Sequence, residues 1–148
     1  ILDVGCGTGL AGAELHALGF KEIDGLDYSR EMLAKAQERN VYRNLFQEDL
    51  NHPVSLADQT YDGMICTGTF THAHVDAACL DELFRALRTG GLFACTIHKD
   101  VWHEAGFSQK VSDMITAGIL STLHKEMDIY FETDDEPQGW YLVWEKLT

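Results

Sequence analysis

A glycine-rich segment near the start of the chain contains the first residues whose spacing suits ligand binding. It is Asp3-Val4-Gly5-Cys6-Gly7-Thr8-Gly9, and it joins a short apolar run to a segment with helical periodicity. Glycines permit a tight turn and a close approach of the backbone to a ligand. The first N–H groups of the helix that follows are free to bind an anion. The segment therefore predicts a ligand site built from backbone, with a turn that binds nothing as the alternative.

Spacing and charge distinguish two ligands that use such loops, a nicotinamide dinucleotide and S-adenosylmethionine. The dinucleotide fingerprint G-x-G-x-x-G/A requires a small residue at position 10, where this chain has Leu10. The Asp3 carboxylate would repel a pyrophosphate but attract a sulfonium and an ammonium group. S-adenosylmethionine is thus the expected cofactor, and the loop residues expected to hold it are Asp3, Gly5, Cys6, Gly7 and Gly9.

Acidic residues follow two further strand-like runs. Asp27 ends the second run, where a carboxylate can accept hydrogen bonds from both ribose hydroxyls. Its alternative role is to cap the next helix, but Ser29 already offers that cap. Glu48, Asp49 and Leu50 follow the third run, where an acid can accept a hydrogen bond from an adenine amino group. Acidic loop residues often only face solvent. This segment therefore indicates a ligand site only in combination with the other motifs.

Two histidines are weak candidates for a catalytic base. His72 and His74 follow the fourth strand-like run, and histidine titrates near neutral pH. The favoured interpretation is that they are ordinary loop or helix-cap residues. They lack a clear third ligand for a metal, so no metal site is expected. Trp102 and Phe107, after the fifth run, either line an acceptor pocket or pack in the core.

The elements that must position these residues alternate between strands and helices. Strands are expected at residues 1–4, 22–26, 41–47, 61–66 and 92–97, with a closing hairpin at 123–131 and 140–145. Helices are expected at 10–18, 29–39, 76–88 and 109–117, the first with Leu10 and Leu18 available for burial. This alternation predicts a doubly wound, Rossmann-like α/β fold: a mostly parallel seven-stranded sheet with helices on both faces and an antiparallel strand from the hairpin. Ligands of such sheets bind at the carboxyl ends of the strands, where the motifs above fall.

Charge and cysteine content narrow the class of protein. The net charge is -13, from 24 acidic and 11 basic residues, which makes nucleic acid an unexpected partner. No apolar run approaches the ~18 residues of a membrane span, so no membrane partner is expected. The cysteines form no C-x-x-C pair and lie in apolar or glycine-rich segments, which indicates reduced thiols and a cytoplasmic protein. They are Cys6, Cys66, Cys79 and Cys95.

Taken together, the motifs between residues 1 and 97 resemble the class I S-adenosylmethionine-dependent methyltransferase family. ILDVGCGTG is similar to the family's first motif, IDGLDYSREML to the segment with its ribose-binding acid, and YDGMICTGTFTHAH to its fourth motif. The resemblance implies methyl transfer from S-adenosylmethionine. It adds four residues to the expected cofactor contacts: Tyr28 and Met32 beside the adenine, and Cys66 and Thr67 in the fourth motif.

The chain also departs from this family. Its members usually have helices before the first motif, so residues 1–148 are expected to be a single methyltransferase core domain without those helices. The fourth motif lacks the N-P-P-Y type signature, which disfavours methylation of amino groups and adenine. Within the family, the chain resembles the subgroup of methyltransferase-like proteins similar to the Williams–Beuren region methyltransferase.

The expected activity is methyl transfer by in-line displacement to a small molecule or a protein, for which alignment is the main requirement. A nicotinamide-dependent oxidoreductase is a competing hypothesis, which Leu10 and Asp3 oppose. A non-catalytic cofactor-binding or scaffold module is the other, because a fold alone does not establish catalysis. The acceptor and the oligomeric state are not indicated by the sequence.

Overall fold

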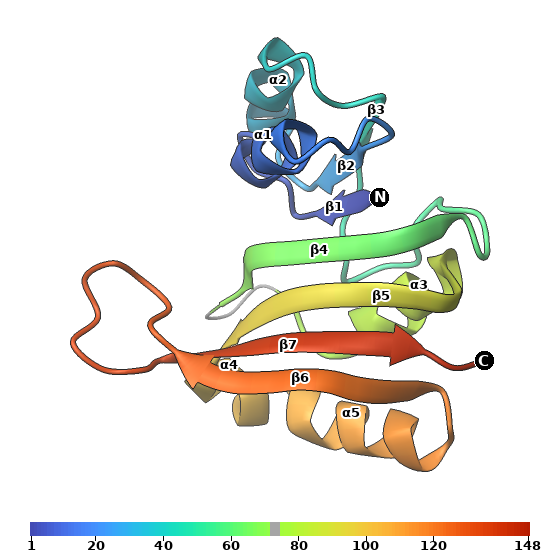
Figure 1. Cartoon of the computed structure of the whole chain (residues 1–148), viewed down its shortest axis with the longest axis vertical. Helices are drawn as coiled ribbons and strands as arrows, with labels where there is room; N and C mark the ends of the chain where they lie inside the picture. The colour runs from blue at the N-terminus through green and yellow to red at the C-terminus, as the bar shows by residue number, and fades with distance from the viewer. Residues whose placement is uncertain (72–74) are drawn as a thin grey trace.

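Seven strands form a single sheet in the computed structural model, which describes residues 1–71 and 75–148. The strand order is β3-β2-β1-β4-β5-β7-β6 (Figure 1). Their bounds are β1 Leu2–Val4, β2 Asp24–Asp27, β3 Asn44–Gln47, β4 Tyr61–Phe70, β5 Leu87–His98, β6 Leu120–Asp128 and β7 Gly139–Lys146. Strands β1 to β5 pair in parallel, whereas β7 runs antiparallel to both β5 and β6. The predicted fold class is confirmed, including the antiparallel strand.

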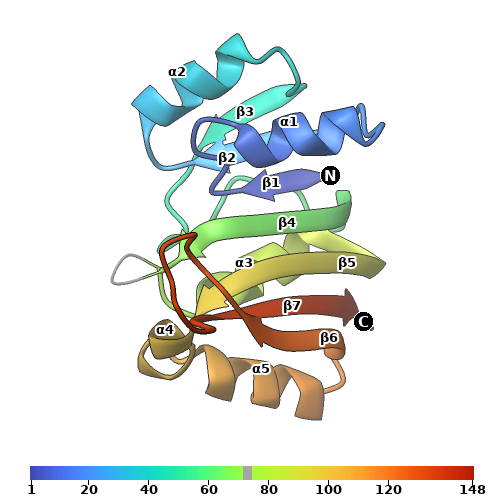
Figure 2. The ribbon, with the colours of Figure 1, turned by 60° about the vertical axis from the view of Figure 1, so that its left-hand side comes forward.

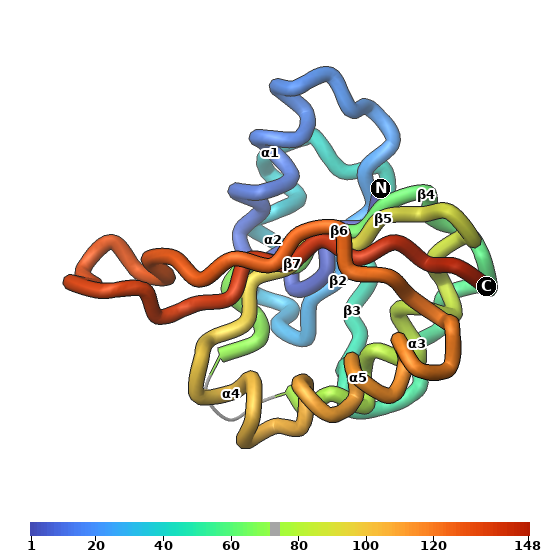
Figure 3. The backbone as a smooth tube through the Cα atoms, turned by 60° about the horizontal axis from the view of Figure 1, so that its bottom comes forward, coloured from blue at the N-terminus to red at the C-terminus, as the bar shows by residue number. Residues whose placement is uncertain are grey.

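Helices cover both faces of this sheet. They are α1 Leu10–Ala17, α2 Arg30–Glu38, α3 Cys79–Ala86, α4 Lys99–Glu104 and α5 Phe107–Thr116. Helix α1 lies on one side of the sheet, and α3, α4 and α5 lie on the other (Figure 3). None of the helices in the described ranges is long and apolar enough to cross a membrane.

Local sequence explains where α2 begins and why α3 docks. Helix α2 begins after Ser29, whose hydroxyl accepts a hydrogen bond from the Met32 N–H at 3.3 Å, as an N-cap residue does. Helix α3 buries one apolar stripe that includes Leu80, Leu83 and Phe84. The Phe84 ring packs near the rings of Phe93 and Trp144 from the sheet. Helices α4 and α5 contribute buried side chains to the same cluster, so the core lies mainly between the sheet and the helices α3, α4 and α5.

The strand order places a switch point beside the first strand. From β1 the chain moves outward to β2 and β3, and then returns to form β4 on the other side of β1. The carboxyl ends of β1, β2 and β4 therefore meet at one edge of the sheet. The β6–β7 loop also extends beyond the ends of β4 and β5 on this side (Figures 1 and 2). Ligands of open α/β sheets bind at such a point.

Some sequence-based expectations are corrected by the packing. The helix expected at 76–88 is shorter, because β5 already begins at Leu87 and continues through the two glycines expected to precede it. Helix α4 was not expected. Leu10 and Leu18 are 66% and 77% exposed, because α1 buries Gly12 instead.

The remaining aromatic and cysteine predictions concern the core. Trp102 and Phe107 are both buried there, so they do not line an open pocket. The four cysteines are buried and free of disulfide bonds, as the sequence indicated.

Candidate cofactor site

The glycine loop between β1 and α1 exposes its backbone to a cavity. Gly5 and Gly7 have φ values of 67° and 54°, in the left-handed region that favours glycine. A Cβ atom on Gly5 would fall on the Thr69 hydroxyl of β4, whereas a Cβ on Gly7 would meet no atom within 4 Å. Gly5 is therefore required by packing against the neighbouring strand, and Gly7 leaves open space above the loop.

Asp27 fixes this loop to the end of β2. Its Oδ2 accepts a hydrogen bond from the Gly7 N–H at 2.9 Å, and its Oδ1 accepts one from the Ser29 N–H at 2.8 Å. The carboxylate is thus held between the loop and the start of α2. Each carboxylate oxygen has a second lone pair, so Asp27 can still accept hydrogen bonds from a ligand. The structural role and the predicted ribose-binding role are compatible.

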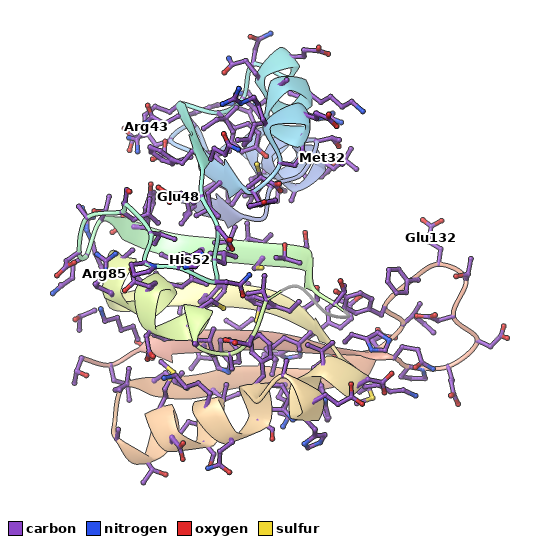
Figure 4. The ribbon with its side chains drawn as sticks, turned by 180° about the vertical axis from the view of Figure 1, so that it is seen from behind. Met32, Arg43, Glu48, His52, Arg85 and Glu132 are labelled. Carbon is purple, nitrogen blue, oxygen red and sulfur yellow. The ribbon has the colours of Figure 1, made fainter. Side chains whose placement is uncertain are left out.

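A cavity of about 1030 Å³ opens above the carboxyl ends of β1, β2 and β4. Eleven of the predicted cofactor contacts line it, namely Asp3, Gly5, Cys6, Gly7, Asp27, Tyr28, Met32, Glu48, Asp49, Leu50 and Thr67. The structure thus brings together segments that lie far apart in the sequence. In Figure 4, Met32 of α2 and Glu48, which follows β3, mark two of these segments.

Two predicted contacts do not line this cavity. Gly9 is the N-cap residue of α1, and a Cβ atom there would point at the Tyr42 ring, 2.9 Å from its nearest atom, behind the loop. Cys66 is fully buried, because successive side chains of a strand alternate between faces and Thr67 is the one that reaches the cavity. Burial raises the pKa of the Cys66 thiol well above its usual value. The weak base candidates His72 and His74 lie outside the described residues.

Sequence reasoning missed several residues of this site. Thr69 and Thr71 line the cavity from the end of β4 and the residue after it, and Leu10 and Ala11 line it from the first turn of α1. Threonine and leucine at these places carry no distinctive motif. Their positions follow from the strand order, which places β4 beside β1.

The charges around the cavity favour a cationic ligand. Four of the described residues that line the cavity are acidic, namely Asp3, Asp27, Glu48 and Asp49, and the described lining contains no lysine or arginine. Burial raises the pKa of Asp3, and the nearby Asp27 charge adds to that effect. Burial also raises the pKa of the Cys6 thiol to about 12, so this thiol stays protonated. An acidic cavity suits a sulfonium compound better than a pyrophosphate.

The apolar side chains at the cavity fit a nucleoside base. Tyr28 is 72% exposed and Met32 is 40% exposed, although both side chains are large and apolar. An aromatic ring and a thioether can pack against a planar base. Together with the bare loop backbone and the free lone pairs of Asp27, these surfaces match the parts of S-adenosylmethionine. The polar groups and apolar surfaces of the cavity therefore fit that cofactor.

Comparisons with known proteins agree with this geometry. Residues 2–95 match the family model described as a methyltransferase domain. The chain is 37% identical over 97 residues to human Methyltransferase-like protein 27, which covers 65% of this chain and 39% of that protein. It is 32% identical over 104 residues to the demethylmenaquinone methyltransferase of Symbiobacterium thermophilum, which covers 64% of this chain and 41% of that protein. The chain thus spans less than half the length of these curated relatives.

A solved structure shows the same fold over nearly the whole chain. An S-adenosylmethionine dependent methyltransferase from Mesorhizobium loti superposes with a TM-score of 0.77 over 98% of this chain and 89% of that one. Its sequence identity is 17%, so this likeness concerns the fold alone.

Proposed function

The chain belongs to the methyltransferase domain family, and on that premise we propose that it transfers a methyl group from S-adenosylmethionine to a small-molecule or protein acceptor. The observation that carries this proposal is the acid-lined cavity at the carboxyl ends of β1, β2 and β4. A nicotinamide-dependent oxidoreductase would need to place a pyrophosphate beside Asp3 and Asp27, against their charges. The family match and the cavity therefore both favour methyl transfer over hydride transfer.

Separate parts of the cavity serve separate parts of the cofactor. The backbone of the glycine loop supports its amino-acid part, and the Asp3 carboxylate below contributes negative charge. Asp27 accepts hydrogen bonds from the ribose hydroxyls. Tyr28 and Met32, which line the cavity, would pack against the adenine, and Glu48 and Asp49 would lie at its edge. This division assigns a role to the glycine loop and to the segments that follow β2 and β3.

The chemistry asks little of the chain beyond alignment. S-adenosylmethionine, when bound, would supply a methyl group on a sulfonium: an acceptor atom bonds to the methyl carbon in line with the C–S bond, and that bond breaks with its electron pair left on the sulfur as a neutral thioether. The residues of the cavity hold the reactants in register and exclude water. A general base is required only for an acceptor that must lose a proton. The role of His72 or His74 as that base remains a prediction.

The acceptor is proposed only as a class. The net charge of -13 disfavours a nucleic-acid acceptor. The name of the Symbiobacterium relative gives demethylmenaquinone as its acceptor, and we do not extend that acceptor to this chain. Placement in the subgroup similar to the Williams–Beuren region methyltransferase is likewise a proposal, supported by the 37% identity with the human methyltransferase-like relative.

Replacement of Asp27 tests the cofactor site. We expect Asp27→Ala to weaken S-adenosylmethionine binding at least roughly tenfold, or about 1.4 kcal/mol, in calorimetric titrations. Asp134→Ala is the matched control, because Asp134 also accepts hydrogen bonds from two backbone N–H groups, at 3.2 and 2.7 Å, but lies in the β6–β7 loop. Equal affinity in wild type and a folded Asp27→Ala variant would contradict the ribose assignment.

Transfer of a labelled methyl group to cell extract then tests catalysis. Full-length protein incubated with labelled S-adenosylmethionine is expected to label an acceptor, and Asp27→Ala to label much less of it. Cofactor binding without any transfer would instead support a non-catalytic binding module. Binding of a nicotinamide dinucleotide in place of S-adenosylmethionine would overturn the proposed function.

A further inference from the structure

Tyr42 occupies a slot made of glycines behind the cofactor loop. It lies in the connection between α2 and β3, and its ring passes under α1. A Cβ atom at Gly9 would lie 2.9 Å from the ring, one at Gly25 would lie 3.0 Å from it, and one at Gly12 would fall on the hydroxyl. Gly9 directly precedes α1, Gly12 lies within α1 and Gly25 lies in β2. Any side chain at these positions would obstruct the Tyr42 ring.

The slot lets the Tyr42 hydroxyl reach the base of the cavity. The hydroxyl donates a hydrogen bond of 2.6 Å to Oδ2 of Asp3. Asp3 is only 1% exposed, yet it is one of the residues that line the cavity. The same segment of chain provides a second contact, because Arg39 Nε donates a hydrogen bond of 2.6 Å to the carbonyl oxygen of Thr8 in the loop. The loop is therefore held from behind by residues at and after the end of α2.

We infer that Tyr42 is a positioning residue of the cofactor site, which holds the Asp3 carboxylate in its place beneath the glycine loop. The inference rests on the proposed function, because the cavity above Asp3 is where that function places S-adenosylmethionine. Tyr42 itself is not among the residues lining the cavity. Its effect on the cofactor therefore passes through Asp3.

The charge of Asp3 gives this role a measurable signature. Burial raises the pKa of Asp3, while hydrogen bonds from the Tyr42 hydroxyl and the Gly12 N–H lower it and the Asp27 charge raises it. The Cys6 thiol is also nearby and stays neutral, since burial raises its pKa to about 12. Loss of the Tyr42 hydroxyl removes one of the groups that favour the ionised carboxylate. Asp3 would then take up a proton at a higher pH, and the cavity would lose negative charge there.

A second tyrosine provides a matched control. The Tyr61 hydroxyl donates a hydrogen bond of 2.9 Å to Oδ2 of Asp24, a buried aspartate that also accepts hydrogen bonds from Arg43. This cluster lies at the amino end of β2, and Figure 4 shows Arg43 and Met32 on opposite sides of the upper part of the molecule. Tyr61→Phe therefore removes the same kind of hydrogen bond away from the cavity.

The experiment measures S-adenosylmethionine binding by calorimetry across a pH series for the wild type, Tyr42→Phe and Tyr61→Phe in the full chain. We expect Tyr42→Phe to bind roughly tenfold more weakly at mildly acidic pH, with the difference narrowing as the pH rises. Tyr61→Phe should follow the wild-type profile even if it unfolds more easily. A wild-type profile for Tyr42→Phe, or an equal shift for Tyr61→Phe, would overturn the inference.

A titration without cofactor separates this inference from the proposed function. Carbon NMR of the Asp3 carboxyl group should give a higher pKa in Tyr42→Phe than in the wild type, and an unchanged pKa in Tyr61→Phe. An unchanged Asp3 pKa in Tyr42→Phe would refute the role of Tyr42 whatever the cofactor does. A wild-type protein that fails to bind S-adenosylmethionine, but shows the expected Asp3 titration, would refute the proposed function and leave Tyr42 as the residue that holds Asp3.

Discussion

Gly7 offers a direct test of whether the cofactor lies against bare backbone. Its φ is 54°, and a Cβ atom there would meet nothing within 4 Å, although Gly7 lines the cavity. Alanine at this position would thus place a methyl group where the ligand must approach, without a clash inside the protein. We expect Gly7→Ala to weaken S-adenosylmethionine binding at least roughly tenfold, equivalent to about 1.4 kcal/mol.

The cost of Gly7→Ala to folding follows from its backbone alone. An L-residue in the left-handed region is disfavoured by about 1–2 kcal/mol, which corresponds to roughly 2–8 °C in melting temperature for a chain of this size. Gly118→Ala is the matched control, because Gly118 has a φ of 70° and also has nothing within 4 Å of an added Cβ. Gly118 follows α5 and is not among the cavity residues. The two variants should lose similar stability.

Thermal unfolding measures the loss of stability in both variants, and calorimetric titration measures their affinity for S-adenosylmethionine. Only Gly7→Ala should lose cofactor affinity, while both melting temperatures fall by a similar amount. If Gly7→Ala binds S-adenosylmethionine as well as Gly118→Ala does, the ligand does not approach the loop and the reasoning fails.

Two buried charges lead to predictions about stability. Lys146 donates hydrogen bonds of 2.6 and 2.8 Å to carbonyl oxygens at the end of α3, so urea unfolding should show Lys146→Met to be less stable by about 1–3 kcal/mol. Burial lowers the pKa of Lys146 below its ordinary value of 10.5. Between the lowered pKa of the folded protein and the ordinary pKa of the unfolded chain, the unfolded chain binds more protons, so the free energy of unfolding of wild type should rise relative to that of Lys146→Met as the pH increases through this range. A difference between the two proteins that does not change with pH would contradict this prediction. Burial alone would raise the pKa of Asp24, but hydrogen bonds led by that from Arg43 lower it below 3.8 overall. The ionised Asp24 carboxylate therefore stabilises the fold above pH 3.8, and this stabilisation is lost as the pH falls through the lowered pKa. In urea unfolding, the difference in stability between wild type and Asp24→Asn should shrink over that pH range. A difference that grows as the pH falls would refute the lowered pKa of Asp24.

Local signals in the sequence were sufficient for most of the elements. The end of β1, the N-cap at Ser29 and the apolar stripe of α3 each depend on residues within a few positions of one another. The start of β5 at Leu87 and the helix α4 were not foreseen. Pairing of Leu87 with Tyr61 of β4 places the start of β5 before Gly90 and Gly91, where the register shifts, and the burial of Trp102 stabilises α4. Contacts of this kind connect distant residues and leave no periodic signature.

The sequence by itself determined the glycine loop, the acid at the end of β2 and the family to which both point, because each depends on a short motif in a strand–loop–helix context. Only the tertiary structure decided which side chains of those motifs face the cavity. Because side chains alternate along β4, Cys66 points into the core and Thr67 points into the cavity. The Tyr42 ring occupies the space beside Gly9. Facing directions at strand ends depend on register and on neighbours distant in sequence, so they exist only once the sheet has assembled.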